Sequence, residues 1–275
     1  MRGVGPPLVT PFSEDGAVDH RRLEQLVDWI EARGVDFVVA CGSTGEAALM
    51  SVEERAAVVE TVVERAGVPV IAGTGHPGLR ETVRQTELAA GAGADAALVV
   101  TPFYYPFSQA EFVEYYRAVA IAADLPVYLY SVPAYTATAL EPDTVGTLAS
   151  HANIVGMKDS SGDFERFQRA RARTRDADFA LMVGSGSVFA QSLAVGATGG
   201  ILALANIAPE GVTEIYDRHR TGDFEGAIER NHSLVDLNWA TTAGYGIAGL
   251  KAAMRQRGAP AGRVRSPHRP VDEVR

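Results

Sequence analysis

The chain has 275 residues, close to the roughly 250 residues typical of a single barrel domain. Hydrophobic residues make up 47% and charged residues 21% of the sequence, which is the balance of an ordinary globular domain and excludes a disordered or fibrous protein. The formal net charge of −9 argues against nucleic acid or an anionic membrane as a partner, because both are bound through basic patches.

Short apolar runs rich in β-branched residues alternate with amphipathic stretches along most of the chain, a pattern typical of parallel strands joined by crossover helices. Ser51 with Glu54 has the spacing of a capping box, and Asp19 and Ser108 are expected N-caps. The predicted helices include Asp19–Arg33, Ser51–Arg65, Leu79–Ala90, Gln109–Ala123 and Asp163–Thr174. The predicted strands are Gly5–Val9, Phe37–Ala40, Val68–Ala72, Ala96–Val100, Val127–Tyr130, Ile154–Met157, Phe179–Val183 and Gly200–Leu204.

Eight such units followed by surplus helical sequence favour a (β/α)8 TIM barrel of the α/β class over the alternative, an open doubly wound sheet. We expect one domain, in which residues 1–208 form the barrel and residues 209–275 a C-terminal helical extension. Residues 259–275, with several prolines and arginines, are predicted to be an irregular surface strap or partly mobile. In a barrel the chemistry gathers at the carboxyl ends of the strands, so the residues that follow each predicted strand are the ones to inspect.

The N-terminal segment has neither the apolar core nor the small-residue cleavage site of a signal peptide, so we expect a cytoplasmic protein. The longest apolar run, residues 193–208, is interrupted by glycines and falls short of the about 18 uninterrupted residues of a membrane helix. The only cysteine, Cys41, ends another apolar run. It is expected to be a small buried side chain rather than a catalytic thiol.

Candidate functional residues follow two of the predicted strands. One group suits anion binding and the other suits proton transfer. Gly42-Ser43-Thr44-Gly45-Glu46 follows the second strand, places two hydroxyls between glycines and is expected to precede a helix N-terminus. Such a loop can bind a carboxylate or phosphate through its amides and hydroxyls, although a simple turn with an N-cap has the same pattern. Tyr130 ends the fifth strand, where it is either a proton donor or a hydrogen-bonded core residue.

A lysine stands at the end of the sixth strand, and the chain has only one other, Lys251. Lysine is rarely buried, yet Lys158 follows the apolar residues Ile154–Met157 at the expected catalytic end of the barrel. A desolvated lysine can attack a carbonyl carbon through its neutral amine; the alternative is an ion pair at the barrel rim. Lys251 lies in a helical stretch and is expected on a solvated helix face.

Two other patterns in the sequence bear on cofactor or metal binding. Residues 73–78 form a glycine-rich turn after a strand and formally satisfy the dinucleotide-binding pattern, but Pro77 stiffens this turn and the unit is third in the series. The histidines show no pairing at metal-ligand spacing. The sequence therefore predicts neither a nucleotide cofactor nor a metal.

Taken together, the motifs resemble the dihydrodipicolinate synthase and N-acetylneuraminate lyase family of pyruvate-dependent class I aldolases, over nearly the whole chain. The resemblance rests on the order in which the motifs occur: Val9-Thr10-Pro11-Phe12, Gly42-Ser43-Thr44-Gly45-Glu46, Thr101-Pro102-Phe103-Tyr104-Tyr105, Tyr130-Ser131-Val132-Pro133 and Gly156-Met157-Lys158-Asp159. It implies a cytoplasmic lyase that needs no cofactor.

The resemblance also implies roles for the matched positions. Lys158 would form the Schiff base with a 2-oxo acid such as pyruvate, and Tyr130 would move protons. Ser43 and Thr44 would bind the substrate carboxylate, with Thr44 also in the catalytic relay. Tyr104 matches a tyrosine that enters a neighbouring subunit's site, which implies a homotetramer built from tight dimers. Positions lining the substrate pocket would include Gly184, Ile201 and Tyr135.

The substrate is narrowed by one departure from the family pattern. Dihydrodipicolinate synthases, which this chain resembles, have an arginine two residues after the proline of the Tyr-x-Val-Pro motif. In this chain that position is Tyr135. The motifs are more similar to those of 2-keto-3-deoxygluconate aldolases and of 4-hydroxy-2-oxoglutarate aldolases. The resemblance therefore implies cleavage of 2-keto-3-deoxygluconate to pyruvate and an aldehyde, with 4-hydroxy-2-oxoglutarate cleavage, 4-hydroxy-tetrahydrodipicolinate synthesis or sugar-acid dehydration as alternatives. A small-molecule sensor without turnover is the non-enzyme alternative.

Overall fold

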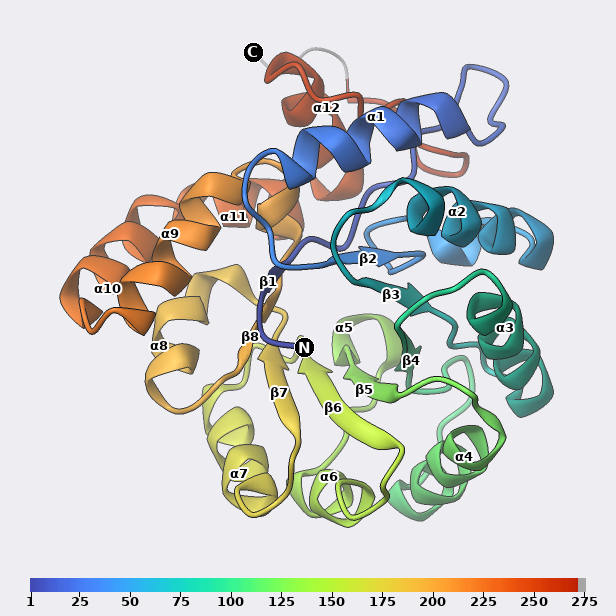
Figure 1. The fold of residues 1–275 in the computed structure, drawn as a ribbon, viewed down its shortest axis with the longest axis vertical. Helices are drawn as coiled ribbons and strands as arrows, with labels where there is room; N and C mark the ends of the chain where they lie inside the picture. Colours follow the sequence, from blue (N-terminus) through green and yellow to red (C-terminus); the bar gives the residue numbers. More distant parts are fainter. Residues whose placement is uncertain (272–275) are drawn as a thin grey trace.

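The computed structural model describes residues 1–271, and in this range eight parallel strands form one closed barrel (Figure 1). Hydrogen-bonded neighbours follow the order β1-β8-β7-β6-β5-β4-β3-β2. Between β2 and β1 the Pro7–Val39 bridge completes the ring, because Leu8 N donates to Val39 O over 2.9 Å. The predicted TIM barrel is therefore confirmed and the open sheet is wrong. The strands are β1 (Gly3–Gly5), β2 (Val38–Ala40), β3 (Val70–Gly73), β4 (Ala96–Val100), β5 (Val127–Ser131), β6 (Ile154–Asp159), β7 (Ala180–Val183) and β8 (Gly199–Ile201).

The first and last strands differ from the sequence prediction, which placed both of them too far along the chain. The first strand was expected at Gly5–Val9, yet β1 ends at Gly5 because Pro6 and Pro7 have no N–H to donate to a ladder. The eighth strand was expected to run to Leu204, but residues 203–206 form a 3-10 turn, η3 (Ala203–Asn206). Apolar composition alone does not distinguish a strand from a buried turn.

The helices that cover the barrel begin where the capping signals indicate. Ser51 and Ser108 each form a complete capping box, and Asp19 accepts the amide hydrogen of Arg22. The helices up to β8 are α1 (His20–Glu31), α2 (Val52–Arg65), α3 (Leu79–Gly91), α4 (Gln109–Ala122), α5 (Pro133–Thr136), α6 (Pro142–Leu148), α7 (Phe164–Thr174) and α8 (Phe189–Ala194), with the 3-10 turns η1 (Ala47–Leu49) and η2 (Gly186–Val188). None of the helices in residues 1–271 is both long and apolar enough to cross a membrane.

Two separate clusters of buried side chains stabilise the barrel. The larger cluster lies between the strands and the surrounding helices and includes Leu26, Val99 and Phe112. The smaller cluster fills the inside of the barrel with inward-facing side chains, among them Phe37, Leu98, Tyr128, Tyr130, Met182 and Ile201. The barrel is thus a packed core, and a side chain on its axis is dry unless it lies near an open end.

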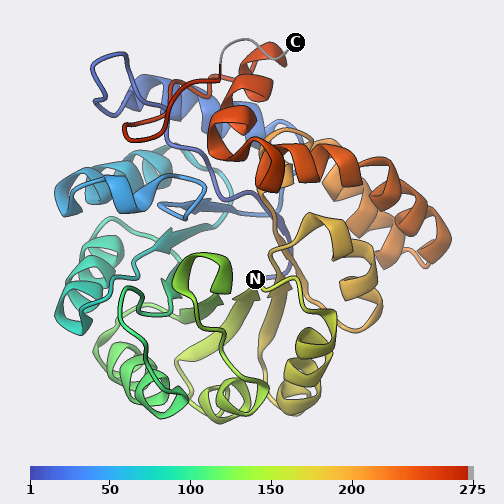
Figure 2. The ribbon, with the colours of Figure 1, turned by 180° about the vertical axis from the view of Figure 1, so that it is seen from behind.

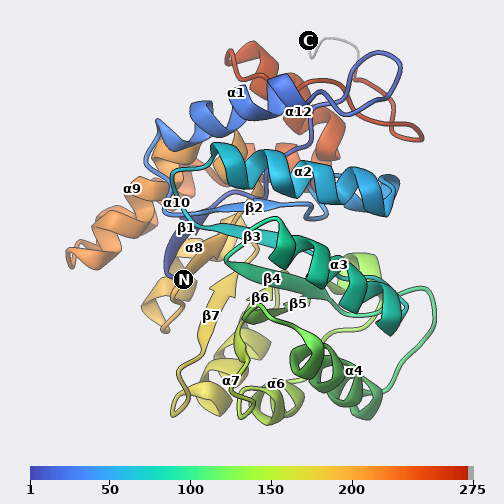
Figure 3. The same ribbon diagram turned by 45° about the vertical axis from the view of Figure 1, so that its right-hand side comes forward.

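Further helices follow β8 and pack beside α1 and α8 (Figure 1). They are α9 (Pro209–Arg220), α10 (Phe224–Ser233), α11 (Val235–Trp239), the π-helical turn η4 (Ala240–Gly244) and α12 (Gly246–Gln256). Residues 259–271 then cross irregularly back to the N-terminal loop, where Arg263 pairs with Phe12 (Figure 3). The irregular strap predicted there is present, while residues 272–275 lie outside the described range.

Lys251 on α12 corrects one sequence expectation. We predicted a solvated helix face, but this side chain is 0% exposed and forms an ion pair with Glu46. The prediction was wrong because Glu46 and the loop at residues 10–16, which lie far away in the sequence, pack against this face together with the irregular strap at 259–271.

Candidate active site

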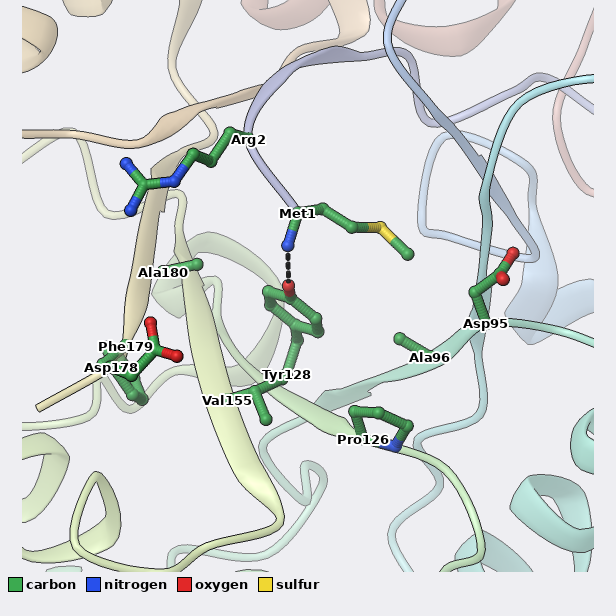
Figure 4. A pocket seen from close by; sticks show the side chains of 10 residues that line it. All are labelled: Met1, Arg2, Asp95, Ala96, Pro126, Tyr128, Val155, Asp178, Phe179 and Ala180. Atoms are coloured by element: carbon green, nitrogen blue, oxygen red, sulfur yellow. Dashed lines mark hydrogen bonds between the residues drawn. The ribbon is translucent and has the colours of Figure 1, made fainter.

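The barrel has two open ends, and only one of them carries the residues singled out in the sequence. Figure 4 shows the other, N-terminal end, where a pocket of about 300 Å³ lies among Met1, Asp95, Tyr128, Asp178 and their neighbours. The Met1 amino group donates to the Tyr128 hydroxyl over 2.6 Å. Lys158, Tyr130 and the loop Gly42–Glu46 lie at the carboxyl ends of their strands, on the side where barrel enzymes have their active sites.

Lys158 and Tyr130 meet inside this carboxyl end. They pair directly across the β5–β6 ladder, so both side chains point the same way, and Lys158 Nζ lies 4.3 Å from the centre of the Tyr130 ring. Lys158 is 4% exposed and Tyr130 5% exposed. A lysine buried against a phenol can act as a nucleophile whose neighbour moves protons.

Gly184, at the end of β7, leaves the space that the Lys158 side chain occupies. A Cβ atom at this position would lie 3.0 Å from Lys158 Cε and 1.9 Å from Ser160 Oγ. The Gly184 amide also donates to the Asp159 carbonyl over 2.6 Å, which holds the two strand ends together. Ile201, at the end of β8, is fully buried in the cluster that contains Tyr130. That Gly184 and Ile201 line a substrate pocket stays a prediction.

The loop Gly42–Glu46 forms a tight turn at the end of β2. The amides of Gly45 and Glu46 donate to the Gly42 and Ser43 carbonyls, and Ser43 and Thr44 are partly exposed at its tip. Contrary to the prediction, no regular helix follows at once, because η1 comes first and α2 begins at Val52. The N-terminus of α2 is therefore separated from the Ser43 and Thr44 hydroxyls by η1.

Tyr135 lies on α5, which crosses the mouth of the barrel at its carboxyl end (Figure 2). The residue exposes 68% of its surface. Burial of the phenol nevertheless raises the pKa of Tyr135, with the Tyr130 hydroxyl adding to the effect. Most of the Tyr135 ring is thus open to solvent, and its hydroxyl is near enough to Tyr130 for their charges to interact.

Tyr104 does not contact these residues within the chain. It lies on the loop between β4 and α4, has a left-handed φ of 81° and is 86% exposed. Its ring stacks edge to face on Tyr105, 5.0 Å away, and the loop projects on the side toward which the strands point (Figure 3). A strained, exposed aromatic pair is typical of a surface that a partner covers.

The remaining sequence candidates are structural in the described residues. Cys41 is 3% exposed, and burial raises the pKa of its thiol to about 11, which fits a small buried side chain. The turn at 73–78 is held by Thr82, whose hydroxyl donates to the His76 carbonyl over 3.0 Å. Within residues 1–271, no three His, Cys, Asp or Glu side chains are grouped to hold a metal ion.

Sequence reasoning assigned no role to Glu46, although the structure buries it. It is 3% exposed and carries a left-handed φ of 58°. The available signal was a carboxylate within an otherwise small and apolar segment, because an acidic residue is seldom buried without a partner. Its partner, Lys251, is 205 residues further along the chain, so pattern analysis could not connect the two.

Comparison with known proteins decides the family. The model of the dihydrodipicolinate synthetase family matches residues 1–275. The chain belongs to the dihydrodipicolinate synthetase family. It is therefore a pyruvate-dependent lyase of this family, and it has the barrel fold of the family's solved structures.

Relatives and solved structures agree with this assignment. A 4-hydroxy-tetrahydrodipicolinate synthase of Methanothrix thermoacetophila is 38% identical, covering 99% of this chain and 92% of that relative. An uncharacterized DapA-like lyase of Halobacterium salinarum is 40% identical, covering 99% and 90%. A prophage protein of Escherichia coli K12 from the dihydrodipicolinic acid synthase family, in complex with pyruvate, superposes with a TM-score of 0.94 at 31% identity, covering 99% of this chain and 94% of that one. A chloride-inhibited dihydrodipicolinate synthase from Acinetobacter baumannii, complexed with pyruvate, gives 0.94 at 35% identity with the same coverage.

Proposed function

We propose that this protein is a class I aldolase that forms a Schiff base between Lys158 and a pyruvate-like 2-oxo acid, and that it cleaves 2-keto-3-deoxygluconate to pyruvate and an aldehyde. The observation that carries the proposal is the buried Lys158 amine beside the Tyr130 ring, 4.3 Å from its centre, at the carboxyl end of the barrel. The pyruvate complexes of the two solved structures named above support the choice of 2-oxo acid.

The proposed chemistry uses only side chains of the chain. Lys158 Nζ attacks the C2 carbonyl, and loss of water leaves a protonated imine. Tyr130 gives its proton to the departing hydroxyl as water leaves. The resulting phenolate takes the proton of the C4 hydroxyl while the C3–C4 bond breaks, and the bonding electrons move into the enamine. Protonation of C3 and hydrolysis of the imine then release pyruvate and restore the lysine. Because the imine nitrogen accepts the electrons, the reaction needs no cofactor.

In this proposal Ser43 and Thr44, which are partly exposed, bind the substrate carboxylate. Their hydroxyls and amides can donate to a carboxylate, while the pocket walls include Gly184 and Ile201. Thr44 would also connect Tyr130 to Tyr104 of a neighbouring subunit, which would complete the proton relay. We therefore propose a homotetramer, to be checked by light scattering of the native protein and of Tyr104→Ala.

The choice among substrates depends on Tyr135. A carboxylate on the second substrate would be held best by an arginine, which offers a charge-assisted bidentate contact. The Tyr135 hydroxyl instead offers one hydrogen bond beside an exposed ring, which suits a hydroxylated aldehyde. We propose 4-hydroxy-2-oxoglutarate as the close alternative substrate.

A second candidate function, condensation of pyruvate with aspartate semialdehyde, is favoured by the names of several relatives, including that of Methanothrix thermoacetophila. The test measures pyruvate release from 2-keto-3-deoxygluconate and from 4-hydroxy-2-oxoglutarate, and pyruvate consumption with aspartate semialdehyde. We expect the first reaction to have the highest kcat/KM. The proposal fails if condensation is the most efficient reaction, if the product keeps the full carbon skeleton as in a dehydration, or if ligands bind without turnover as in a sensor.

A further inference from the structure

The second lysine of the chain, Lys251, is buried next to the loop of the proposed site. Lys251 on α12 is 0% exposed, and its ammonium donates to the Thr10 carbonyl over 2.6 Å, to the Arg263 carbonyl over 2.7 Å and to Glu46 Oε1 over 2.5 Å. An ammonium group has three hydrogens to donate. All three are therefore used, which leaves no lone pair for attack on a carbonyl and separates Lys251 from the chemistry proposed for Lys158.

The partner of Lys251 is the last residue of the loop proposed to bind the substrate carboxylate. Glu46 Oε1 accepts from Lys251, and Glu46 Oε2 accepts from the Arg265 amide over 3.0 Å. Its backbone is left-handed, with φ at 58°, a conformation that a non-glycine residue keeps only when its surroundings hold it. The two contacts to its carboxylate supply that constraint.

A second contact from the same assembly fixes the preceding residue. The Thr10 hydroxyl donates to the Gly45 carbonyl over 2.7 Å, while the Thr10 carbonyl accepts from Lys251. Gly45 fits closely, because a Cβ atom there would lie 2.9 Å from the Leu8 carbonyl oxygen. The end of the loop is thus held by Thr10 in the segment after β1 and by the strap, and the Lys251 ammonium of α12 contacts both.

Glu46 supplies the negative charge that compensates the buried Lys251 ammonium group. Burial lowers the pKa of Lys251 to about 8, the Glu46 carboxylate opposes that change, and Arg255 and Arg265 act in the same direction as burial. Removing one member of a buried pair leaves the other charge uncompensated. Loss of either partner is therefore expected to move the loop and not merely to weaken one contact.

We propose that Lys251 is a positioning residue, which acts through Glu46 and Thr10 to hold the Gly42–Glu46 loop in the conformation that presents Ser43 and Thr44 to the carboxylate of a 2-oxo acid. This inference rests on the proposed function. A displacement of about 1 Å in such a loop can reduce catalysis by up to about a hundred-fold without any change in the reacting groups. The effect should fall on the capture of the substrate and not on the later steps at Lys158.

The test follows the formation of the imine. Native protein is incubated with pyruvate and borohydride, and the rate of inactivation is measured against pyruvate concentration. In Lys251→Met we expect the half-saturating pyruvate concentration to rise on the order of ten- to a hundred-fold, while the limiting rate stays within about three-fold. Thermal midpoints are recorded in parallel.

The matched control is Glu54→Gln, which removes the negative charge that pairs with Arg265, whose Nη2 lies 2.5 Å from Glu54 Oε1. It weakens the same strap but leaves all three Lys251 contacts in place. We expect a lower thermal midpoint with an unchanged half-saturating concentration. If Lys251→Met fails to fold, the isosteric Glu46→Gln provides the measurement, and a rise in half-saturating pyruvate concentration is again expected.

A folded Lys251→Met or Glu46→Gln variant that keeps the wild-type half-saturating concentration and loses only thermal stability would overturn the positioning role. So would an equal rise in the Glu54→Gln control. If the wild-type protein itself is not trapped by borohydride, the proposed function fails and this inference with it. The failure of the inference alone is recognised by normal trapping in all variants.

Discussion

Lys158 and Tyr130 face each other on neighbouring strands, paired in register, with the lysine nitrogen 4.3 Å from the centre of the phenol ring. Both are almost completely buried, although one is cationic in water and the other polar. Burial of a lysine without a carboxylate as its close partner is costly, which supports the catalytic role proposed for the pair.

Borohydride in the presence of pyruvate should inactivate the protein irreversibly, because reduction fixes the imine on Lys158. Peptide mass spectrometry should find the added mass on the peptide that contains this residue. Without pyruvate, borohydride should leave the activity intact. An adduct on Lys251, whose three hydrogens are already donated, would contradict both the proposed function and the role given to the second lysine.

Tyr130→Phe should still form the imine but lose most of its turnover. The substitution keeps the ring that packs beside Lys158 and removes only the hydroxyl, and general acid–base steps contribute roughly 10²–10⁴-fold. The measurement compares kcat for retro-aldol cleavage with the yield of the borohydride adduct. Activity near that of the wild-type protein would exclude Tyr130 from the proton transfers.

Gly184→Ala should impair imine formation more than folding. The added Cβ atom would lie 3.0 Å from Lys158 Cε and 1.9 Å from Ser160 Oγ, so either side chain must move from its place. The double variant Gly184→Ala with Ser160→Ala serves as the control, because it removes the nearest obstacle and leaves the contact with the lysine. We expect the double variant to recover thermal stability but only part of the trapping rate; full recovery of both would assign Gly184 to packing against Ser160.

Cys41 should resist alkylation in the native protein. Burial raises the pKa of its thiol to about 11, above the usual value of about 8.5, so the thiol stays protonated as the pH rises through 8 and becomes a thiolate only near the raised value. Iodoacetamide at pH 8 should modify it in urea but not in buffer, as read by intact mass. Rapid modification in buffer would show that the end of β2 opens more readily than its packing indicates.

The sequence predicted those parts of the fold that depend on local patterns. The alternation of apolar runs and amphipathic helices predicted the barrel, because each unit carries its own strand and capping signals, as at Ser51 and Ser108. It was uninformative where the deciding neighbour lies far along the chain. Lys251 belongs to an ordinary helical pattern, and only the folded chain brings Glu46, Thr10 and the strap around it.

The same limit applies at the barrel mouth. The order of motifs predicted that Lys158, Tyr130 and the Gly42–Glu46 loop would share one end, because strand ends converge in a closed barrel. It did not predict that η1 would separate this loop from α2 by a further turn, since alanine and leucine favour either kind of helix. Nor did it predict that Tyr135 would expose its ring, because α5 is too short to show a periodic face.

Tyr135 is expected to decide which substrate the protein prefers. Tyr135→Arg would place a guanidinium on α5 at the barrel mouth, where the wild-type side chain is 68% exposed and its phenol couples to Tyr130. A guanidinium can form two charge-assisted hydrogen bonds with a carboxylate, whereas the phenol forms one neutral bond. We therefore expect the variant to gain at least about ten-fold in kcat/KM for condensation of pyruvate with aspartate semialdehyde, since one such contact contributes roughly 1.5–3 kcal/mol. Cleavage of 2-keto-3-deoxygluconate should fall at the same time, while the borohydride adduct with pyruvate alone should form as in the wild-type protein, because Lys158 is untouched.

Tyr135→Phe is the control and should lower cleavage without raising condensation. If the wild-type protein already favours condensation and Tyr135→Arg adds nothing, another basic side chain must bind the semialdehyde carboxylate, and the substrate proposed from Tyr135 is wrong.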